Sequence, residues 1–234
     1  YKVIIVGLGK AGSLYSLKRD KFLSHAEAVN KFKNFKLLAG VDNNKDKANI
    51  FEKKYNIKSY LSIDKLVKRE KFDIAIIAVP TILQYKTLKK ILTLTKNKVL
   101  LCEKPCTNNI RQIKKIRHIL GKRNSKCFVN YQRSSLISSK KIKKIIYNNK
   151  KVLINVSYSN GLLNSASHYI SLFINYFGDD FKIFKKNSSK LRLVSDFSSN
   201  FSIIYPNCKI NFKSKNFYKK IHGNFEINIK NKKI

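Results

Sequence analysis

The chain has 234 residues, of which 43% are hydrophobic and 12% aromatic, so it can bury a substantial core and is neither a disordered tail nor a collagen-like protein. Its 50 Lys and Arg residues against 13 Asp and Glu residues give a formal net charge of +37, which excludes an acidic binding protein and makes a polyanionic partner a candidate. No apolar run approaches the roughly 18–20 residues of a membrane span, so we expect no membrane partner.

Three explanations of the basic charge remain open. Lys, Asn and Ile are the residues that AT-rich codons supply, so a biased genome alone could fill the surface with Lys. A positive field that attracts phosphorylated or acidic substrates is the second explanation. Nucleic-acid binding is the third, but the sequence has no zinc finger and no RNA-binding signature, so we expect no specific nucleic-acid partner.

Hydrophobic periodicity predicts alternating strands and helices in the first part of the chain. Apolar runs of strand length occupy residues 2–6, 36–41, 73–79, 98–102 and 126–130. Helical spacing occupies residues 10–19, 45–55, 62–69, 82–96 and 109–120. Ser62 is expected to cap the third of these helices and Gly121 to end the last. This alternation predicts an α/β fold with a doubly wound parallel sheet.

The pattern changes after Arg133. A basic amphipathic helix is expected over residues 138–147, a strand over 151–158, and a helix over 164–177 that ends at Gly178. Short alternating runs then predict strands at residues 181–186, 191–197, 201–205, 209–213 and 224–230. The sequence therefore predicts two domains, one with the doubly wound parallel sheet over residues 1–132 and an α+β domain with an open, mainly antiparallel sheet over residues 133–234.

Residues 7–12 fit the pattern G-x-G-x-x-G between a strand and a helix, the context in which it binds a dinucleotide. Gly7 permits the tight turn, Gly9 lets the backbone approach a pyrophosphate, and Gly12 allows close helix–strand packing. Lys10 and Ala11 complete the turn, whose amides face the anion. The alternative is a glycine turn that only reverses the chain.

Asp42 ends the second strand, where a carboxylate can bind the adenosine ribose hydroxyls and repels a 2′-phosphate. It therefore favours NAD, although NADP is not excluded because Lys45 and Lys47 lie nearby. Asp42 could instead cap the next helix. The third strand ends at Val79, Pro80 and Thr81, which are expected to line the cofactor cleft or to form an ordinary turn.

The four cysteines form no C-x-x-C pair, so they indicate neither a disulfide framework nor a zinc site, and we expect no metal. Cys102 and Cys127 adjoin apolar runs and are expected to be small buried hydrophobes. This composition, with no signal peptide before the first strand, favours a cytoplasmic protein.

These motifs together resemble the Gfo/Idh/MocA family of NAD(P)-dependent oxidoreductases. The likeness rests on the glycine turn, Asp42, residues 78–81, Cys102-Glu103-Lys104-Pro105 and Asn130-Tyr131-Gln132-Arg133, and extends from Tyr1 to about Gly178. It implies a Rossmann domain joined to a substrate and oligomerisation domain, and hydride transfer between NAD and a hydroxyl or ketone of a sugar. Residues 25–28 and 161–168 resemble the branch of surface-polysaccharide and sugar-nucleotide gene clusters, which implies a nucleotide-sugar substrate.

The resemblance also implies roles for individual residues. Lys104 would hold the reacting oxygen beside the nicotinamide, with Glu103 next to it in the cofactor site, and His168 would take or return the alcohol proton. The substrate side would contain Tyr131, Arg133, Asn164 and His168. Positions 164 and 168 are expected on one face of one helix turn. His25 would approach the substrate or serve the structure.

Two features depart from the family pattern. Many members have Asp where this chain has Asn164, and an amide can position substrate but cannot act as a base. Members also continue beyond the point where this chain stops, and the chain has no Met. We therefore expect a fragment or a shortened second domain. Because members commonly oligomerise through the sheet of that domain, a homo-oligomer is left open. These departures favour a second hypothesis, a dinucleotide-binding homologue without catalysis, while only the charge favours a third, a nucleic-acid-binding protein.

Overall fold

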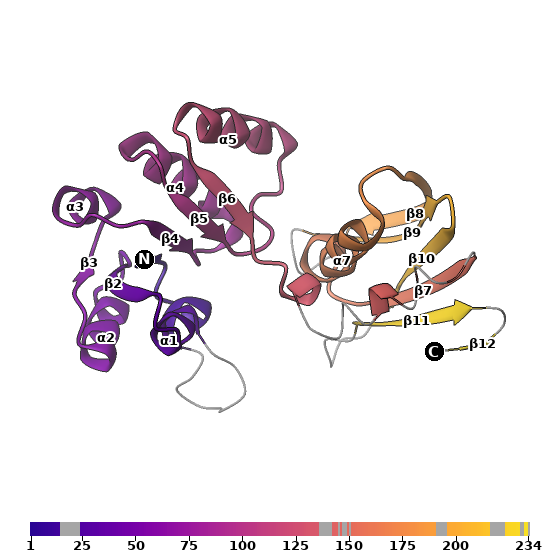
Figure 1. Cartoon of the computed structure of the whole chain (residues 1–234), viewed down its shortest axis with the longest axis horizontal. Coiled ribbons are helices and arrows are strands. Elements are labelled where there is room, and N and C mark those ends of the chain that lie inside the picture. Colours follow the sequence, from indigo (N-terminus) through magenta and orange to yellow (C-terminus); the bar gives the residue numbers. More distant parts are fainter. Residues whose placement is uncertain are drawn as a thin grey trace. The chain divides into compact units, whose positions relative to one another are not determined.

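A computed structural model describes residues 1–14, 24–135, 142–144, 146, 149, 151–190, 196–215, 223–229 and 232–233. The chain divides into two compact units, Tyr1–Asn130 and Tyr131–Ile234 (Figure 1). Among the described residues, no helix is both long and apolar enough to cross a membrane.

The first unit is built on a six-stranded parallel sheet in the order β3-β2-β1-β4-β5-β6. Its strands are β1 (Lys2–Val6), β2 (Lys36–Val41), β3 (Ser59–Tyr60), β4 (Ile74–Ile77), β5 (Val99–Cys102) and β6 (Lys126–Val129). The predicted doubly wound parallel sheet is therefore confirmed. The two-residue strand β3 was not predicted, because it is too short to show a hydrophobic period.

Helices cover both faces of this sheet. They are α1 (His25–Lys31), α2 (Lys45–Tyr55), α3 (Ile63–Arg69), α4 (Thr81–Leu94) and α5 (Ile110–Lys122). Alternate side chains of β1 point to opposite faces, so Val3 and Ile5 pack with α1 and α2, whereas Ile4 and Val6 pack with α3, α4 and α5. Both faces are thus buried, as the uninterrupted apolar runs predicted.

Two predicted helices differ from the structure, one in helix type and one in its end point. The helix expected over residues 10–19 begins as a π-helical turn, Lys10–Leu14, and its remainder lies outside the described residues. The helix expected to stop at Gly121 continues to Lys122. Asn124 adopts the left-handed conformation there, with φ 48°, so it takes the place at the helix end that we assigned to glycine.

The second unit contains a six-stranded sheet in the order β12-β11-β7-β10-β9-β8. Its strands are β7 (Val152–Tyr158), β8 (Lys182–Lys190), β9 (Phe197–Tyr205), β10 (Cys208–Ser214), β11 (Gly223–Ile229) and β12 (Lys232–Lys233). The pairs are antiparallel except for β7 with β10, so the sheet is mixed. Helix α7 (Ser167–Phe177) packs its buried aromatic side chains on one face of the sheet, and Gly178 ends it as predicted.

Strand boundaries in this unit differ from the prediction. Strand β8 extends to Lys190 and β9 begins at Phe197, so both are longer than expected. Most of the strand expected over residues 191–197 lies outside the described residues, as does most of the helix expected over 138–147. Of that helix, residues 142–144 and 146 are described and are helical.

Candidate active site

The carboxyl ends of five parallel strands meet along one edge of the first sheet. Val6 pairs with both Val41 and Ile77, Ile77 pairs with Cys102, and Cys102 pairs with Val129. Backbone hydrogen bonds continue one residue beyond the strands, from the amide of Glu103 to Ile77 at 2.9 Å, for example. The glycine turn, Asp42, residues 78–81, Glu103–Lys104 and Asn130 therefore all follow strands at this edge, where open α/β sheets bind ligands.

The glycine turn is packed closely on two sides. Gly7 has φ +96°, and a Cβ there would lie 2.7 Å from the carbonyl carbon of Ala78. A Cβ on Gly12 would lie 1.9 Å from the carbonyl oxygen of Gly7. A Cβ on Gly9, by contrast, would meet no described atom within 4 Å. The turn thus has an open side at Gly9, and the exposed Lys10 and partly buried Ala11 follow it.

Asp42 is fixed against this turn. One of its carboxylate oxygens accepts a hydrogen bond from the amide of Leu8 at 2.8 Å, and the other accepts one from the amide of Asn44 at 2.9 Å. The N-cap of helix α2 is Asn44, whose side chain accepts a hydrogen bond from the amide of Lys47. Asp42 therefore joins the end of β2 to the glycine turn and is not the helix cap.

Residues after β4 form the start of helix α4. Val79 and Thr81 are partly buried and Pro80 is exposed. Pro80 is the N-cap residue and has no side-chain capping hydrogen bond. Gln84, one turn into the helix, is 1% exposed, and its Oε1 has no hydrogen-bond partner among the described residues. The sequence could have indicated Gln84, since it shares the buried face of α4 with Leu88.

Glu103 is held by two side chains from distant parts of the sequence. Nε2 of His25 lies 2.8 Å from Oε1 of Glu103, and the Nδ2 amide of Asn130 donates to the same oxygen at 2.8 Å. Burial acts to raise the pKa of Glu103, but the hydrogen bonds from His25 and Asn130 outweigh it and leave the pKa below its usual value. The adjacent Lys104 is partly buried and precedes a cis peptide bond to Pro105.

The second unit brings together three residues that we assigned to the substrate side. The rings of Tyr131 and His168 meet edge to face, with centroids 5.8 Å apart. The guanidinium of Arg133 lies 4.6 Å from the ring centroid of Tyr169, the residue after His168, and donates to its hydroxyl at 2.8 Å. The segment after β6 and the start of α7 are therefore packed against each other.

The fourth substrate-side residue, Asn164, lies in a π-helical turn, Leu162–Ala166, that precedes α7. His168 lies in α7, which continues directly from that turn, so the helix expected over residues 164–177 begins as a π-helical turn and not as an α-helix. The side chain of Asp196, which is 6% exposed, accepts hydrogen bonds from the amides of Leu163 and Asn164, both at 2.9 Å. Sequence reasoning missed Asp196, because nothing local marks its contact with residues 32 positions away.

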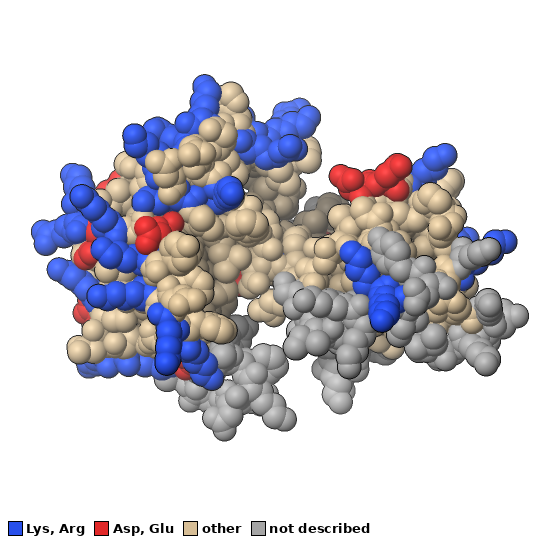
Figure 2. Space-filling model, in the orientation of Figure 1, with Lys and Arg blue, Asp and Glu red and all other residues tan. Residues whose placement is uncertain are grey.

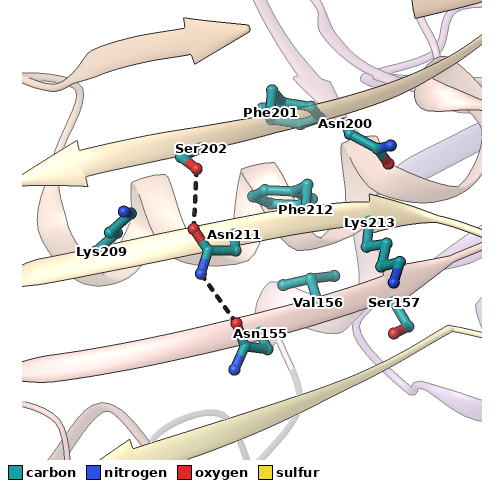
Figure 3. A pocket seen from close by; sticks show the side chains of 10 residues that line it. All are labelled: Asn155, Val156, Ser157, Asn200, Phe201, Ser202, Lys209, Asn211, Phe212 and Lys213. Atoms are coloured by element: carbon teal, nitrogen blue, oxygen red, sulfur yellow. Dashed lines mark hydrogen bonds between the residues drawn. The ribbon is translucent and has the colours of Figure 1, made fainter. Parts of the chain in front are cut away.

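A concavity of about 420 Å³ lies on the open face of the second sheet (Figure 3). Ser202, Asn211 and Asn155 form a hydrogen-bonded row there across β9, β10 and β7, with lengths of 2.9 and 3.0 Å. None of the residues assigned to a site from the sequence lines it. The structure therefore separates this polar face from the predicted substrate residues.

Lys and Arg side chains cover much of the face of the first unit that Figure 2 shows, with fewer Asp and Glu side chains between them. The described part of the chain contains no group of three or more His, Cys, Asp and Glu residues that could hold a metal ion.

Comparison with known proteins extends this description. The model of the family described as "Oxidoreductase family, NAD-binding Rossmann fold" (Gfo/Idh/MocA) matches residues 1–131. No curated protein matches the sequence.

Several solved structures share the fold of the whole chain. The dehydrogenase MviM from Clostridium difficile superposes with a TM-score of 0.77 at 19% identity, covering 99% of this chain and 75% of that chain. Myo-inositol 2-dehydrogenase from Lactobacillus plantarum gives 0.78 at 13%, covering 100% and 75%. The WlbA dehydrogenase from Bordetella pertussis, solved with NADH and UDP-GlcNAcA, gives 0.79 at 15%, covering 97% and 74%. Because the family model matches more than half of the sequence, this chain belongs to the Gfo/Idh/MocA family of NAD-binding oxidoreductases.

Proposed function

We propose that the chain transfers a hydride between NAD(H) and a hydroxyl or ketone carbon of a sugar or nucleotide sugar. One observation carries this proposal: Lys104 follows a strand at the same sheet edge as the glycine turn, next to a carboxylate that His25 and Asn130 hold. An ammonium group at that edge can stabilise charge on a reacting oxygen.

The residues of the first unit fit a dinucleotide. The side of the turn at Gly9 is open, which leaves room for a pyrophosphate to approach the backbone. Asp42 would bind the adenosine ribose, because its carboxylate is fixed at the end of β2. Further cofactor contacts would come from Gly7, Lys10, Ala11, Gly12, Val79, Pro80, Thr81 and Glu103. NAD, when bound, supplies the nicotinamide that accepts or gives the hydride.

We assign two catalytic roles to this chain. Lys104 would hold the substrate oxygen and stabilise its negative charge. His168 would take the proton of the hydroxyl during oxidation and return it during reduction, since imidazole titrates near neutral pH. Tyr131 packs against the His168 ring and restricts its orientation. Arg133 and the side-chain amide of the exposed Asn164 would bind substrate oxygens.

Two observations support a nucleotide sugar as the substrate class. The relative WlbA was solved with UDP-GlcNAcA, an acidic nucleotide sugar, whereas other relatives are inositol dehydrogenases. The net charge of +37 would attract a substrate with phosphate and carboxylate groups more strongly than a neutral polyol.

The test is turnover with a panel of UDP-sugars, including UDP-GlcNAcA, with myo-inositol as the neutral comparison. We expect NADH formation with an acidic nucleotide sugar. Lys104→Ala should abolish turnover while leaving the Kd for NADH within about twofold, which corresponds to less than roughly 0.5 kcal/mol. Binding of NADH without turnover of any candidate by the wild-type protein would favour the non-catalytic homologue. Equal loss of turnover and NADH binding in Lys104→Ala would contradict the role of Lys104.

A further inference from the structure

Three of the four cysteines form a cluster beside the candidate active site. Cys102 is the last residue of β5, Cys127 lies in β6, and Cys106 lies between β5 and α5. The sulfur atoms of Cys102 and Cys127 are 3.4 Å apart. Cys106 forms side-chain hydrogen bonds with both of them. Nothing in the sequence spacing predicts this arrangement, because we expected Cys102 and Cys127 to be ordinary buried hydrophobes.

The members of the cluster differ in exposure and in pKa. Cys102 is fully buried, whereas Cys106 and Cys127 are partly exposed. Hydrogen bonds from the thiols of Cys102 and Cys127 lower the pKa of Cys106. The hydrogen bond to Cys106 raises the pKa of Cys102, which therefore keeps its proton. Of these three thiols, Cys106 is the one whose pKa is lowered, so it converts most readily to the thiolate, which is the reactive form of cysteine.

We propose that Cys106 is a site of oxidation by hydroperoxides, and that one of the two neighbouring thiols captures the oxidised sulfur as a disulfide. The Cys106 thiolate attacks the peroxide, the O–O bond breaks, and a sulfenic acid forms with release of hydroxide. The thiol of Cys102 or Cys127 then attacks that sulfur, an S–S bond forms, and water leaves. The net reaction converts two thiols and one hydrogen peroxide into one disulfide and two waters.

The sheet geometry explains why the disulfide should include Cys106. Cys127 pairs with Leu100 across the parallel strands, so Cys102 lies two residues further along its own strand. Given a strand spacing of about 4.8 Å and a rise of about 3.3 Å per residue, their Cα atoms are roughly 8 Å apart. A disulfide requires Cα atoms within about 7 Å. Cys106 lies outside the sheet ladder, between β5 and α5, and its side chain contacts both neighbours.

The modification would also affect the proposed activity, and this consequence depends on the proposed function. Cys106 is two residues after Lys104, so a disulfide would displace the segment that presents the ammonium group. We therefore expect turnover to fall as the disulfide forms and to return with dithiothreitol. The oxidation itself is measured without any activity assay, so failure of the proposed function would leave the test of oxidation intact.

Peptide mapping can identify the bridge in the wild-type protein. The protein is treated with hydrogen peroxide, blocked with iodoacetamide and digested with trypsin, which does not cut between Lys104 and Pro105. Cys102 and Cys106 then share one peptide, residues 99–111, while Cys127 lies in residues 127–133. A bridge from Cys106 to Cys102 lowers the mass of the first peptide by two hydrogens, and a bridge to Cys127 joins the two peptides. Either result supports the proposal.

Cys208 is the internal control, because burial raises its pKa to about 12. We expect Cys106 to lose its thiol at least about tenfold faster than Cys208. Cys106→Ser should abolish the bridge, whereas Cys208→Ser should leave it unchanged. Equal rates at Cys106 and Cys208, or a bridge that persists in Cys106→Ser, would overturn the proposal. The rate comparison uses the wild-type protein and so does not depend on how any variant folds.

Discussion

His25 and Glu103 are 78 residues apart in the sequence, yet Nε2 of His25 lies 2.8 Å from Oε1 of Glu103. His25 is the first residue of α1, and Glu103 follows β5 and precedes Lys104. The contact therefore joins the helix after the glycine turn to the residue beside the proposed catalytic lysine. We expected His25 either to approach the substrate or to serve the structure, and its contact with Glu103 supports the second role.

This contact predicts a pH dependence of stability. A carboxyl group whose pKa is lowered by folding stabilises the fold above its ordinary pKa of about 4.3, and this contribution is lost as the pH falls through the lowered value. The melting temperature of the wild-type protein should therefore fall more than that of Glu103→Gln when the pH is lowered from about 6 to about 3. If the melting temperatures of the two proteins fell by the same amount over this pH range, the hydrogen bonds to Glu103 would not depend on its charge.

Two variants of the glycine turn should differ in effect, one weakening NADH binding and the other lowering the free energy of unfolding. Gly9→Ala should fold normally, because its Cβ would meet no described atom within 4 Å, but it should weaken NADH binding by about tenfold or more by obstructing the pyrophosphate. Gly12→Ala should lose roughly 3 kcal/mol of unfolding free energy, because its Cβ would overlap the Gly7 carbonyl oxygen.

A matched control for these variants is Gly121→Ala. It lies in α5, its Cβ would also meet no described atom within 4 Å, and it should raise the free energy of unfolding by about 0.5–1 kcal/mol while leaving NADH binding unchanged. Chemical denaturation and NADH fluorescence measure both quantities. Normal NADH affinity in Gly9→Ala would contradict the placement of the pyrophosphate.

Asp42 predicts the cofactor preference. Asp42→Asn removes the negative charge but keeps an oxygen that can accept the hydrogen bond from the amide of Leu8. We expect the ratio of NADP to NAD affinity to rise about tenfold, which corresponds to about 1.4 kcal/mol, because the repulsion of the 2′-phosphate is lost. Asp46→Asn in the first turn of α2 removes the same charge nearby and should leave the ratio unchanged. Tighter binding of NADP than NAD by the wild-type protein would overturn the assignment.

Replacement of Asp196 should destabilise the second unit. Its carboxylate accepts hydrogen bonds from the amides of Leu163, Asn164 and Phe197, and Asp196→Ala would leave these donors without their acceptor. We expect a loss of about 3 kcal/mol in the free energy of unfolding. Asp196→Asn keeps one acceptor oxygen and should lose less. Hydrogen exchange at the amides of Leu163 and Asn164 should increase in Asp196→Ala, and unchanged exchange there would contradict the anchoring role.

The sequence predicts the parts of this protein that depend on local pattern. The parallel strands are apolar on both faces, so they form continuous runs, and the glycine turn is recognisable because close packing against Ala78 and Gly7 requires glycine at Gly7 and Gly12. Asn44 and Asn109 cap helices through their own side chains, and so does Ser62, which the sequence indicated.

Contacts between distant residues are not visible in such patterns. The pairing of His25 with Glu103 and of Asp196 with Asn164 arises only when the fold brings separate elements together. The same is true of the thiols of Cys102 and Cys127, which come from neighbouring strands. The parallel pairing of β7 with β10 was also not predicted, because alternation of side chains reveals a strand but not the direction of its neighbour.

Four carboxylates of the described residues accept hydrogen bonds from the protein's own backbone amides. Asp73 accepts from the amide of Lys2 and Glu52 from that of Ser59, as Asp42 and Asp196 do elsewhere. Lys54 pairs with Glu27 and Lys90 with Asp64, but the chain has 50 Lys and Arg residues against 13 Asp and Glu residues, so most of the surplus cationic groups repel one another across the surface. Dissolved anions screen that repulsion. Rising ionic strength should therefore strengthen this fold, opposite to its effect on a protein held together by surface ion pairs.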